Sequence, residues 1–112
     1  MKMHTKIIAA SITFILGSAL SFAAPAAENW DNSCAKCHGA DGKGQTKIGK
    51  KLKLKDYSDA AVQAALTDEE IIKVTAEGVT DDKGKERMKG FKGEFSESEI
   101  KDFVALIRGF KA

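Results

Sequence analysis

Histidine, proline and sheet-forming stretches are scarce in this chain of 112 residues. Its two histidines are His4 and His38, and its one proline is Pro25. No run of β-branched residues predicts a β-sheet, and the sequence has no internal repeat, low-complexity tract or second domain. Because this length is typical of one small domain, we expect a single fold built from helices.

Residues 1–26 are predicted to be a secretory signal peptide. Lys2 and Lys6 give a positively charged start, and an apolar stretch over residues 7–20 follows. Small residues after this stretch fit the cleavage rule for exported proteins. The sequence therefore predicts export, and the periplasm is the expected location.

Cleavage is expected after Ala23 or Ala26, which leaves a mature domain of residues 27–112. The alternative is an uncleaved membrane anchor, because the uncharged run over residues 7–27 is about long enough to span a bilayer. The small residues and Pro25 at the end of this run favour cleavage. No membrane span is expected once the leader is removed.

The two cysteines and the second histidine form the motif Cys34-Ala35-Lys36-Cys37-His38. On a helix, residues at positions i, i+3 and i+4 share one face, so Cys34, Cys37 and His38 point the same way. This pattern is the attachment motif of a c-type haem. Two thioethers would hold the macrocycle, and the imidazole of His38 would reach the iron as an axial ligand.

Three other kinds of site use the same residue types: a thioredoxin-like redox pair, half of a zinc site and a plain disulfide. A structural zinc site needs four ligands, and after the leader only Cys34, Cys37 and His38 are available. A thioredoxin-like pair requires a βαβ context, which this sequence lacks. Covalent haem attachment takes place outside the cytoplasm, in agreement with the signal peptide, so one haem c is the favoured cofactor.

Residues on both sides of the motif are expected to pack against the haem. Trp30 lies four residues before Cys34, on the same helical face, and is either a neighbour of the haem edge or an ordinary core tryptophan. The loop after His38 is not a phosphate-binding loop, because it lacks the Gly-Lys-Ser/Thr ending and no predicted strand precedes it. Glycine is needed where the backbone has a positive φ or approaches a ligand closely, so the haem face is the expected neighbour of Gly39, Gly42 and Gly44.

Helical patterns cover much of the mature domain. A short helix is expected to end at the haem motif, and an alanine-rich helix is expected over Ser58–Leu66. A third helix is predicted over Asp68–Glu77, between a capping box that begins at Thr67 and the terminating Gly78.

The last helix is predicted over Glu97–Arg108, after a capping box that begins at Ser96. It carries an apolar stripe at helical spacing, which we expect to pack on Trp30 and which consists of Ile100, Phe103, Val104 and Ile107. The predicted fold class is all-α, with about four short helices around one covalently attached haem.

Met88 lies in residues 79–95, which are rich in glycine and charge and are predicted to be irregular. Methionine usually fills gaps in cores, which does not explain one in a polar loop, whereas its sulfur is a known axial ligand of haem iron. Met88 is the only methionine after the leader, and no second histidine remains. We therefore predict Met88 as the sixth ligand; the alternatives are an open position or a lysine, such as Lys85, Lys89 or Lys92.

In their order along the chain, these features resemble those of class I, single-haem cytochromes c of the small bacterial type. The resemblance rests on Trp30, the haem motif with its glycine-rich loop, residues 66–71, the pattern Met88-x-x-Phe91 and the closing helix. It implies an all-α fold with crossing terminal helices and an exposed haem edge. It also implies axial ligation by His38 and Met88 and packing of Phe91 against the haem.

Two prolines that are common in this family are missing. One usually follows the haem loop, where a carbonyl accepts a hydrogen bond from the proximal histidine, and the other usually follows the ligand methionine, where this chain has Lys89. The loop that holds Met88 is therefore expected to be softer than usual. We expect a lysine to displace Met88 at moderately raised pH.

The expected function is that of a soluble, monomeric electron carrier and not of an enzyme. With both axial positions filled, the iron changes oxidation state without binding a substrate. If Met88 is not a stable ligand, the alternatives are a haem-based gas sensor or a dedicated haem subunit of a redox enzyme. A peroxidase is disfavoured because no distal histidine is available.

Charge is unevenly distributed along the mature domain. Removing the leader leaves 16 basic and 16 acidic residues, so a nucleic-acid binder is not indicated. Residues 56–82 are mostly acidic, whereas residues 43–55 contain Lys43, Lys47, Lys50, Lys51, Lys53 and Lys55. These lysines form either a surface that steers an acidic redox partner or an ordinary solvated loop. A steering surface predicts that electron transfer slows as salt is added.

Overall fold

The computed structural model describes residues 23–111. Most of the predicted signal peptide lies outside this range, whereas the two predicted cleavage positions, Ala23 and Ala26, fall in the first helix, α1 (Ala23–Ser33). Between residues 23 and 111, no helix combines the length and the apolar character that a membrane span requires. The signal peptide and its cleavage remain sequence-based predictions.

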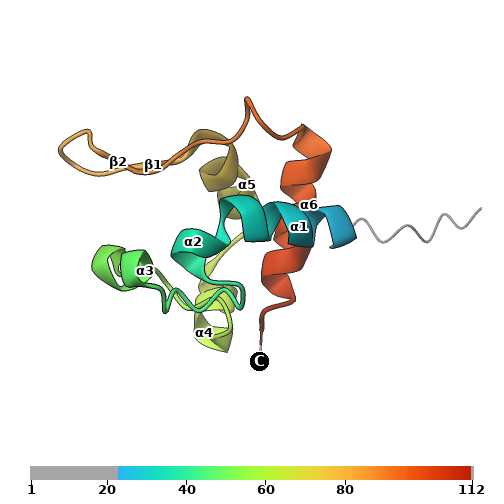
Figure 1. The fold of residues 1–112 in the computed structure, drawn as a ribbon, viewed down its shortest axis with the longest axis horizontal. Helices are drawn as coiled ribbons and strands as arrows, with labels where there is room; N and C mark the ends of the chain where they lie inside the picture. The colour runs from blue at the N-terminus through green and yellow to red at the C-terminus, as the bar shows by residue number, and fades with distance from the viewer. Residues whose placement is uncertain (1–22, 112) are drawn as a thin grey trace, which may run out of the picture.

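Helices make up most of the fold, and one small hairpin interrupts them (Figure 1). Before the hairpin come α1, α2 (Ala35–His38), α3 (Lys47–Leu52), α4 (Ala60–Ala65) and α5 (Asp68–Glu77). Strands β1 (Val79–Thr80) and β2 (Glu86–Met88) then pair antiparallel, and α6 (Glu97–Arg108) closes the chain. The predicted all-α class is confirmed in this mostly helical fold.

The core forms where α1 crosses α6, with α5 packed against α6 as well (Figure 1). The predicted apolar stripe of α6 is buried, and Phe103 is only 1% exposed. Trp30, 4% exposed, belongs to the same apolar cluster. Burying such a side chain stabilises a fold by about 1.5–3 kcal/mol relative to leaving it in water. The prediction that Trp30 packs against the closing helix is thus confirmed.

Local hydrogen bonds fix where α5 and α6 begin. The Thr67 hydroxyl accepts a bond from the Glu70 N–H at 3.1 Å. At the start of α6 the Ser96 hydroxyl accepts from the Glu99 N–H, and the Glu99 carboxylate accepts from the Ser96 N–H. Such bonds satisfy backbone donors that the first turn leaves free. The predicted bounds of both helices are confirmed, and α4 lies within its predicted range.

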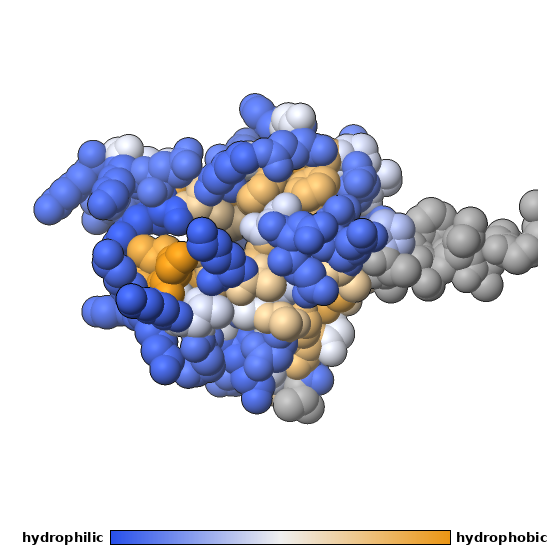
Figure 2. All heavy atoms as spheres, in the orientation of Figure 1, coloured by the Kyte–Doolittle hydropathy of each residue, from blue (hydrophilic) through white to orange (hydrophobic). Residues whose placement is uncertain are grey.

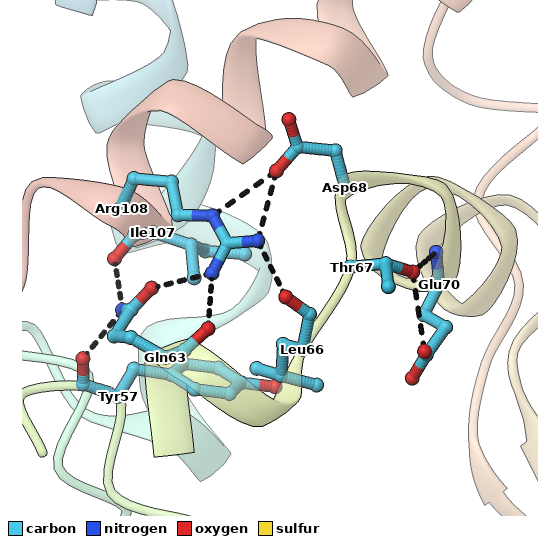
Figure 3. Close-up of polar contacts among 8 residues, drawn as sticks. All are labelled: Tyr57, Gln63, Leu66, Thr67, Asp68, Glu70, Ile107 and Arg108. Atoms are coloured by element: carbon cyan, nitrogen blue, oxygen red, sulfur yellow. Dashed lines mark hydrogen bonds and ion pairs between the residues drawn. The ribbon is translucent and has the colours of Figure 1, made fainter. Parts of the chain in front are cut away.

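Arg108 joins the ends of three helices (Figure 3). Its guanidinium donates to the carbonyl oxygens of Gln63 and Leu66, both at 2.7 Å, and pairs with Asp68 at 2.9 Å. Gln63 is buried and donates in turn to the carbonyl oxygen of Ile107 at 2.8 Å. These bonds hold the corner between α4 and α5 on the C-terminal end of α6.

The segment of residues 79–95 differs from its prediction, because it contains the β1–β2 hairpin and is not irregular throughout. Val79 pairs with Met88 across the two strands. The carboxylate of Asp81 shapes the turn by accepting bonds from the N–H groups of Lys83 and Lys85, both at 2.9 Å. A side chain that bonds backbone donors two and four residues ahead favours a turn over a loose loop.

The lysine-rich segment also differs from an ordinary surface loop, since residues 47–52 form α3. Thr46 is its N-cap and accepts a 2.8 Å bond from the Gly49 N–H. Lys53 ends the helix with a left-handed conformation at φ 56°. The loop interpretation is therefore corrected for α3, while its lysines are exposed as predicted.

Candidate haem site

The haem motif lies on the short helix α2; Cys34 and His38 line a cavity described below, whereas Cys37 is not part of a cavity wall, so the shared direction of all three side chains stays a prediction. The Cys34 N–H donates to the Trp30 carbonyl oxygen at 2.8 Å, and the His38 N–H donates to the Cys34 carbonyl oxygen at 2.9 Å, so the helical path continues from α1. Cys34 is buried and Cys37 half-buried, and no disulfide joins them. Burial, and then the neighbouring Cys37, raises the pKa of the Cys34 thiol to about 11. This sulfur therefore lies in apolar surroundings that suit an uncharged thioether.

His38 is held between two aromatic rings. The ring of Tyr57 stacks on the imidazole at 5.4 Å with an interplanar angle of 17°, and the Trp30 ring lies 5.5 Å away. Burial lowers the pKa of His38 below its ordinary value, which favours the neutral imidazole that ligates metals. The Nδ1 atom is buried and has no hydrogen-bond partner among the described residues. This agrees with the missing family proline, near which a carbonyl usually accepts from the proximal histidine.

An apolar cavity of about 350 Å³ opens beside the motif. Its wall combines parts of α1, α2, α5, α6 and the hairpin. The lining residues are Trp30, Cys34, His38, Lys55, Tyr57, Leu66, Glu70, Ile71, Val74, Thr75, Val79, Met88, Phe103 and Ile107. This volume lies within the range of about 300–1,000 Å³ that is usual for ligand sites. The cavity is therefore large enough to hold a bound group.

A second cavity of about 390 Å³ continues the first, because six residues belong to both walls, among them His38, Tyr57 and Met88. The second wall is more polar and includes Lys53, Lys55, Asp81 and Arg87. The structure therefore brings His38 and Met88, the two predicted axial ligands, to one continuous space. An imidazole, a thiol on the same helical turn, a thioether and apolar walls fit the chemistry of a c-type haem.

The three predicted loop glycines do adopt positive φ, at 84° for Gly39, 70° for Gly42 and 67° for Gly44. A Cβ on Gly42 would lie 2.5 Å from the ring of Phe110, and one on Gly44 would lie 3.1 Å from Leu54. Their close neighbours are thus protein groups, and these glycines are not part of either cavity wall. Their predicted contact with the haem face remains a prediction.

Phe91 is buried, but it does not line the cavities either. Its ring stacks on Phe95 at 5.6 Å, and Phe95 meets Phe103 edge-on at 5.2 Å. The three rings therefore connect the segment after Met88 to α6. Packing of Phe91 against the haem remains a prediction, whereas its packing against protein is observed.

Tyr57 is a cavity residue that was not predicted from the sequence. It lines both cavities, and burial, followed by the effect of Cys34, raises the pKa of its hydroxyl above the ordinary value. Its N–H donates to the carbonyl oxygen of Gly42 at 2.9 Å, which fixes the ring beside His38. The sequence feature that could have pointed to Tyr57 is that it is the only tyrosine of the chain.

A helical fold in which Cys34 and His38 of a Cys-x-x-Cys-His motif line an apolar cavity is typical of a covalent haem protein. More specifically, this chain belongs to the cytochrome c family, whose model matches residues 23–111. Membership in this family shows that the chain carries one covalently bound c-type haem and serves haem-based electron transfer.

Solved structures agree with this assignment. The chain is similar to the KustC0563 c-type cytochrome, with a TM-score of 0.67 and 33% identity over 78% of this chain and 98% of that one. It is also similar to a mutant of that protein with one tyrosine replaced by phenylalanine, with a TM-score of 0.65 and 34% identity over 77% of this chain and 98% of that one. A comparison with curated proteins finds no match.

Proposed function

We propose that this protein is a soluble periplasmic electron carrier whose haem iron has His38 and Met88 as axial ligands. The observation that carries the proposal is that these two side chains, from α2 and β2, line the same cavity. When bound, the haem supplies a one-electron centre, and ligation by histidine and methionine raises its potential.

The protein's own residues have separate tasks in this proposal. Cys34 and Cys37 hold the group by thioethers, and the half-buried, neutral imidazole of His38 provides one axial ligand. Trp30 and Phe103 exclude water from the inner wall. With both axial positions taken by side chains, no position is left for a substrate, so the proposed role is that of a carrier and not of an enzyme.

Two features support a periplasmic location. The sequence begins with a predicted signal peptide, and thioether attachment of haem takes place outside the cytoplasm. Each feature alone would be weaker support for this location than the two together. The two sequence features are independent of each other and point to the same compartment.

We further propose that the exposed lysines on and around α3 dock an acidic redox partner. The Thr46 hydroxyl donates to the carbonyl oxygen of Cys37 at 2.5 Å, so α3 is fixed directly to the haem motif. Figure 2 shows a small apolar area at α3 surrounded by hydrophilic side chains, and Lys53 and Lys55 line the adjoining cavity. An apolar contact with a charged rim suits the brief encounters of a monomeric carrier with its partners.

The test is spectroscopic and uses the purified holoprotein. The ferric protein should show the weak near-infrared band of methionine-ligated haem, and the ferrous protein should bind carbon monoxide slowly. Met88→Ala should abolish the band and accelerate binding. A wild-type protein that lacks the band and binds carbon monoxide rapidly would contradict the carrier and favour a gas-binding role.

A further inference from the structure

We propose that Gly78 and Gly90 position Met88 for the iron by allowing its strand to lie directly on the end of α5. This inference rests on the proposed ligation by Met88 and names what holds that ligand. The family resemblance leads us to expect a proline after the methionine, whereas the next residue here is Lys89. The contacts of residues 88–92 show a different restraint.

The segment after Met88 caps helix α5. The last carbonyl groups of a helix have no partner within it. Here the Phe91 N–H donates to the Thr75 carbonyl oxygen at 2.9 Å, and the Lys92 N–H donates to the Ala76 carbonyl oxygen at 3.1 Å. Thr75 and Phe91 are both buried, so an unpaired carbonyl would be costly at this place. The end of α5 therefore needs this segment in position.

The two glycines permit this approach because neither has a side chain. A Cβ on Gly90 would lie 2.7 Å from the Ala76 carbonyl oxygen and 2.8 Å from that of Glu77. A Cβ on Gly78 would overlap the carbonyl oxygen of Met88 and lie 2.7 Å from the Gly90 nitrogen. All these neighbours are backbone atoms, which cannot turn aside as the tip of a flexible side chain can. Any side chain here must push residues 88–90 away from α5.

Met88 is thus restrained from both directions along the chain. Before it, β2 pairs with β1, where Met88 faces Val79 directly after Gly78. After it, the bonds from Phe91 and Lys92 hold the backbone on α5. A metal-binding group must be held within about 0.5 Å of its working position. Moving this backbone away from α5 would therefore withdraw the sulfur from the iron.

The chain offers a matched control for each glycine. Gly90 and Gly93 both lie in the segment after Met88 without a positive φ, but a Cβ on Gly93 meets nothing within 4 Å. Gly78 and Gly84 have nearly the same φ, 80° and 78°, but a Cβ on Gly84 also meets nothing within 4 Å. Alanine at Gly93 or Gly84 therefore reproduces the loss of glycine without the crowding.

The experiment compares four holoprotein variants: Gly90→Ala, Gly78→Ala, Gly93→Ala and Gly84→Ala. The first two should lose the near-infrared band at neutral pH, or lose it at lower pH than the wild type during an alkaline titration. They should also bind carbon monoxide faster in the ferrous state. The two controls should match the wild type in both measurements. If Gly90→Ala behaves like Gly93→Ala, the inference is overturned.

The wild type separates this inference from the proposed ligation. A wild type without the band contradicts ligation by Met88, and the inference then falls with it. A wild type with the band and an unaffected Gly90→Ala overturns the inference alone. If Gly90→Ala takes up no haem, amide hydrogen exchange of the wild type provides the test: Phe91 and Lys92 should exchange as slowly as amides within α5. Exchange as fast as at the exposed Gly93 would overturn the inference.

Discussion

The indole Nε1 of Trp30 donates a 2.8 Å hydrogen bond to the carbonyl oxygen of Gly39. This bond spans the haem motif and joins α1 to the residue directly after His38. The Trp30 ring also contacts Phe110, with the ring centroids 5.1 Å apart. Trp30 is therefore a core residue that also fixes the backbone beside the proposed proximal ligand.

Trp30→Phe should keep much of the aromatic packing but leave the buried Gly39 carbonyl without its donor. An unsatisfied buried acceptor costs about 1–3 kcal/mol, so the free energy of unfolding should fall by about that amount. Denaturant titration of the ferric holoprotein measures the change. Stability equal to that of the wild type would contradict a structural role for the bond.

Arg108→Ala should destabilise the fold, because the arginine bonds two carbonyl oxygens and a carboxylate. Hydrogen bonds to a charged group contribute about 1.5–3 kcal/mol, and we expect a loss in that range. Lys101→Ala is the control on the same helix, since its exposed pair with Glu97 contributes about 0.3–0.5 kcal/mol. Thermal unfolding compares the two, and equal effects would contradict the network's importance.

Removing the haem should unfold most of the chain. The core contains a cavity of about 350 Å³, which the haem is expected to fill. Without the haem, a domain of this size buries only a modest apolar core. The double variant Cys34→Ala, Cys37→Ala without haem should therefore lose most of its helical far-UV circular dichroism. A near-native spectrum from this variant would refute the expectation.

Electron transfer to an acidic partner should slow as salt is added, because ions screen attraction over about 10 Å at 0.1 M. Lys50→Glu, on α3, should lower the association rate at low salt and reduce its salt dependence. Lys101→Glu, on α6, makes the same charge change away from α3 and should have a smaller effect. Stopped-flow kinetics distinguish them, and a flat salt profile of the wild type would rule out steering.

Stability in acid should depend on Glu99. The backbone N–H of Ser96, and then its side chain, lower the pKa of the Glu99 carboxyl below the ordinary value of 4.5. Because the folded pKa is the lower one, ionised Glu99 stabilises the fold above pH 4.5, and this contribution is lost as the pH falls through the folded value. Glu99→Gln should flatten the acid limb of the stability profile, and an unchanged limb would argue against the bond.

The beginnings and ends of α5 and α6 could be predicted because capping depends on residues within four positions of each other. Thr67, Gly78 and Ser96 all act in this local way. The hairpin was missed because strands of two and three residues are too short to show an alternating pattern. Its turn depends on the Asp81 side chain, which the sequence shows only as one more acidic residue in a charged segment.

Within the site, His38 and Met88 could be singled out because one histidine and one methionine remain after the leader; both line one cavity, and their ligation stays a prediction. The position of Tyr57 beside His38 and the bonds of Arg108 could not be predicted, because their partners lie far away in the sequence. Arg108 reaches residues 40–45 positions earlier, and no local pattern encodes such contacts. The sequence predicted Arg108 only as part of the last helix.

Gly93 combines open surroundings with an ordinary backbone conformation, and both cysteines of the chain lie in the haem motif. Once both sulfurs are bound in thioethers, a cysteine introduced by Gly93→Cys is the one reactive thiol of the holoprotein. It offers a single attachment point, five residues beyond Met88, for a fluorescent label or a gold electrode. The protein could then be attached to the electrode in one defined orientation.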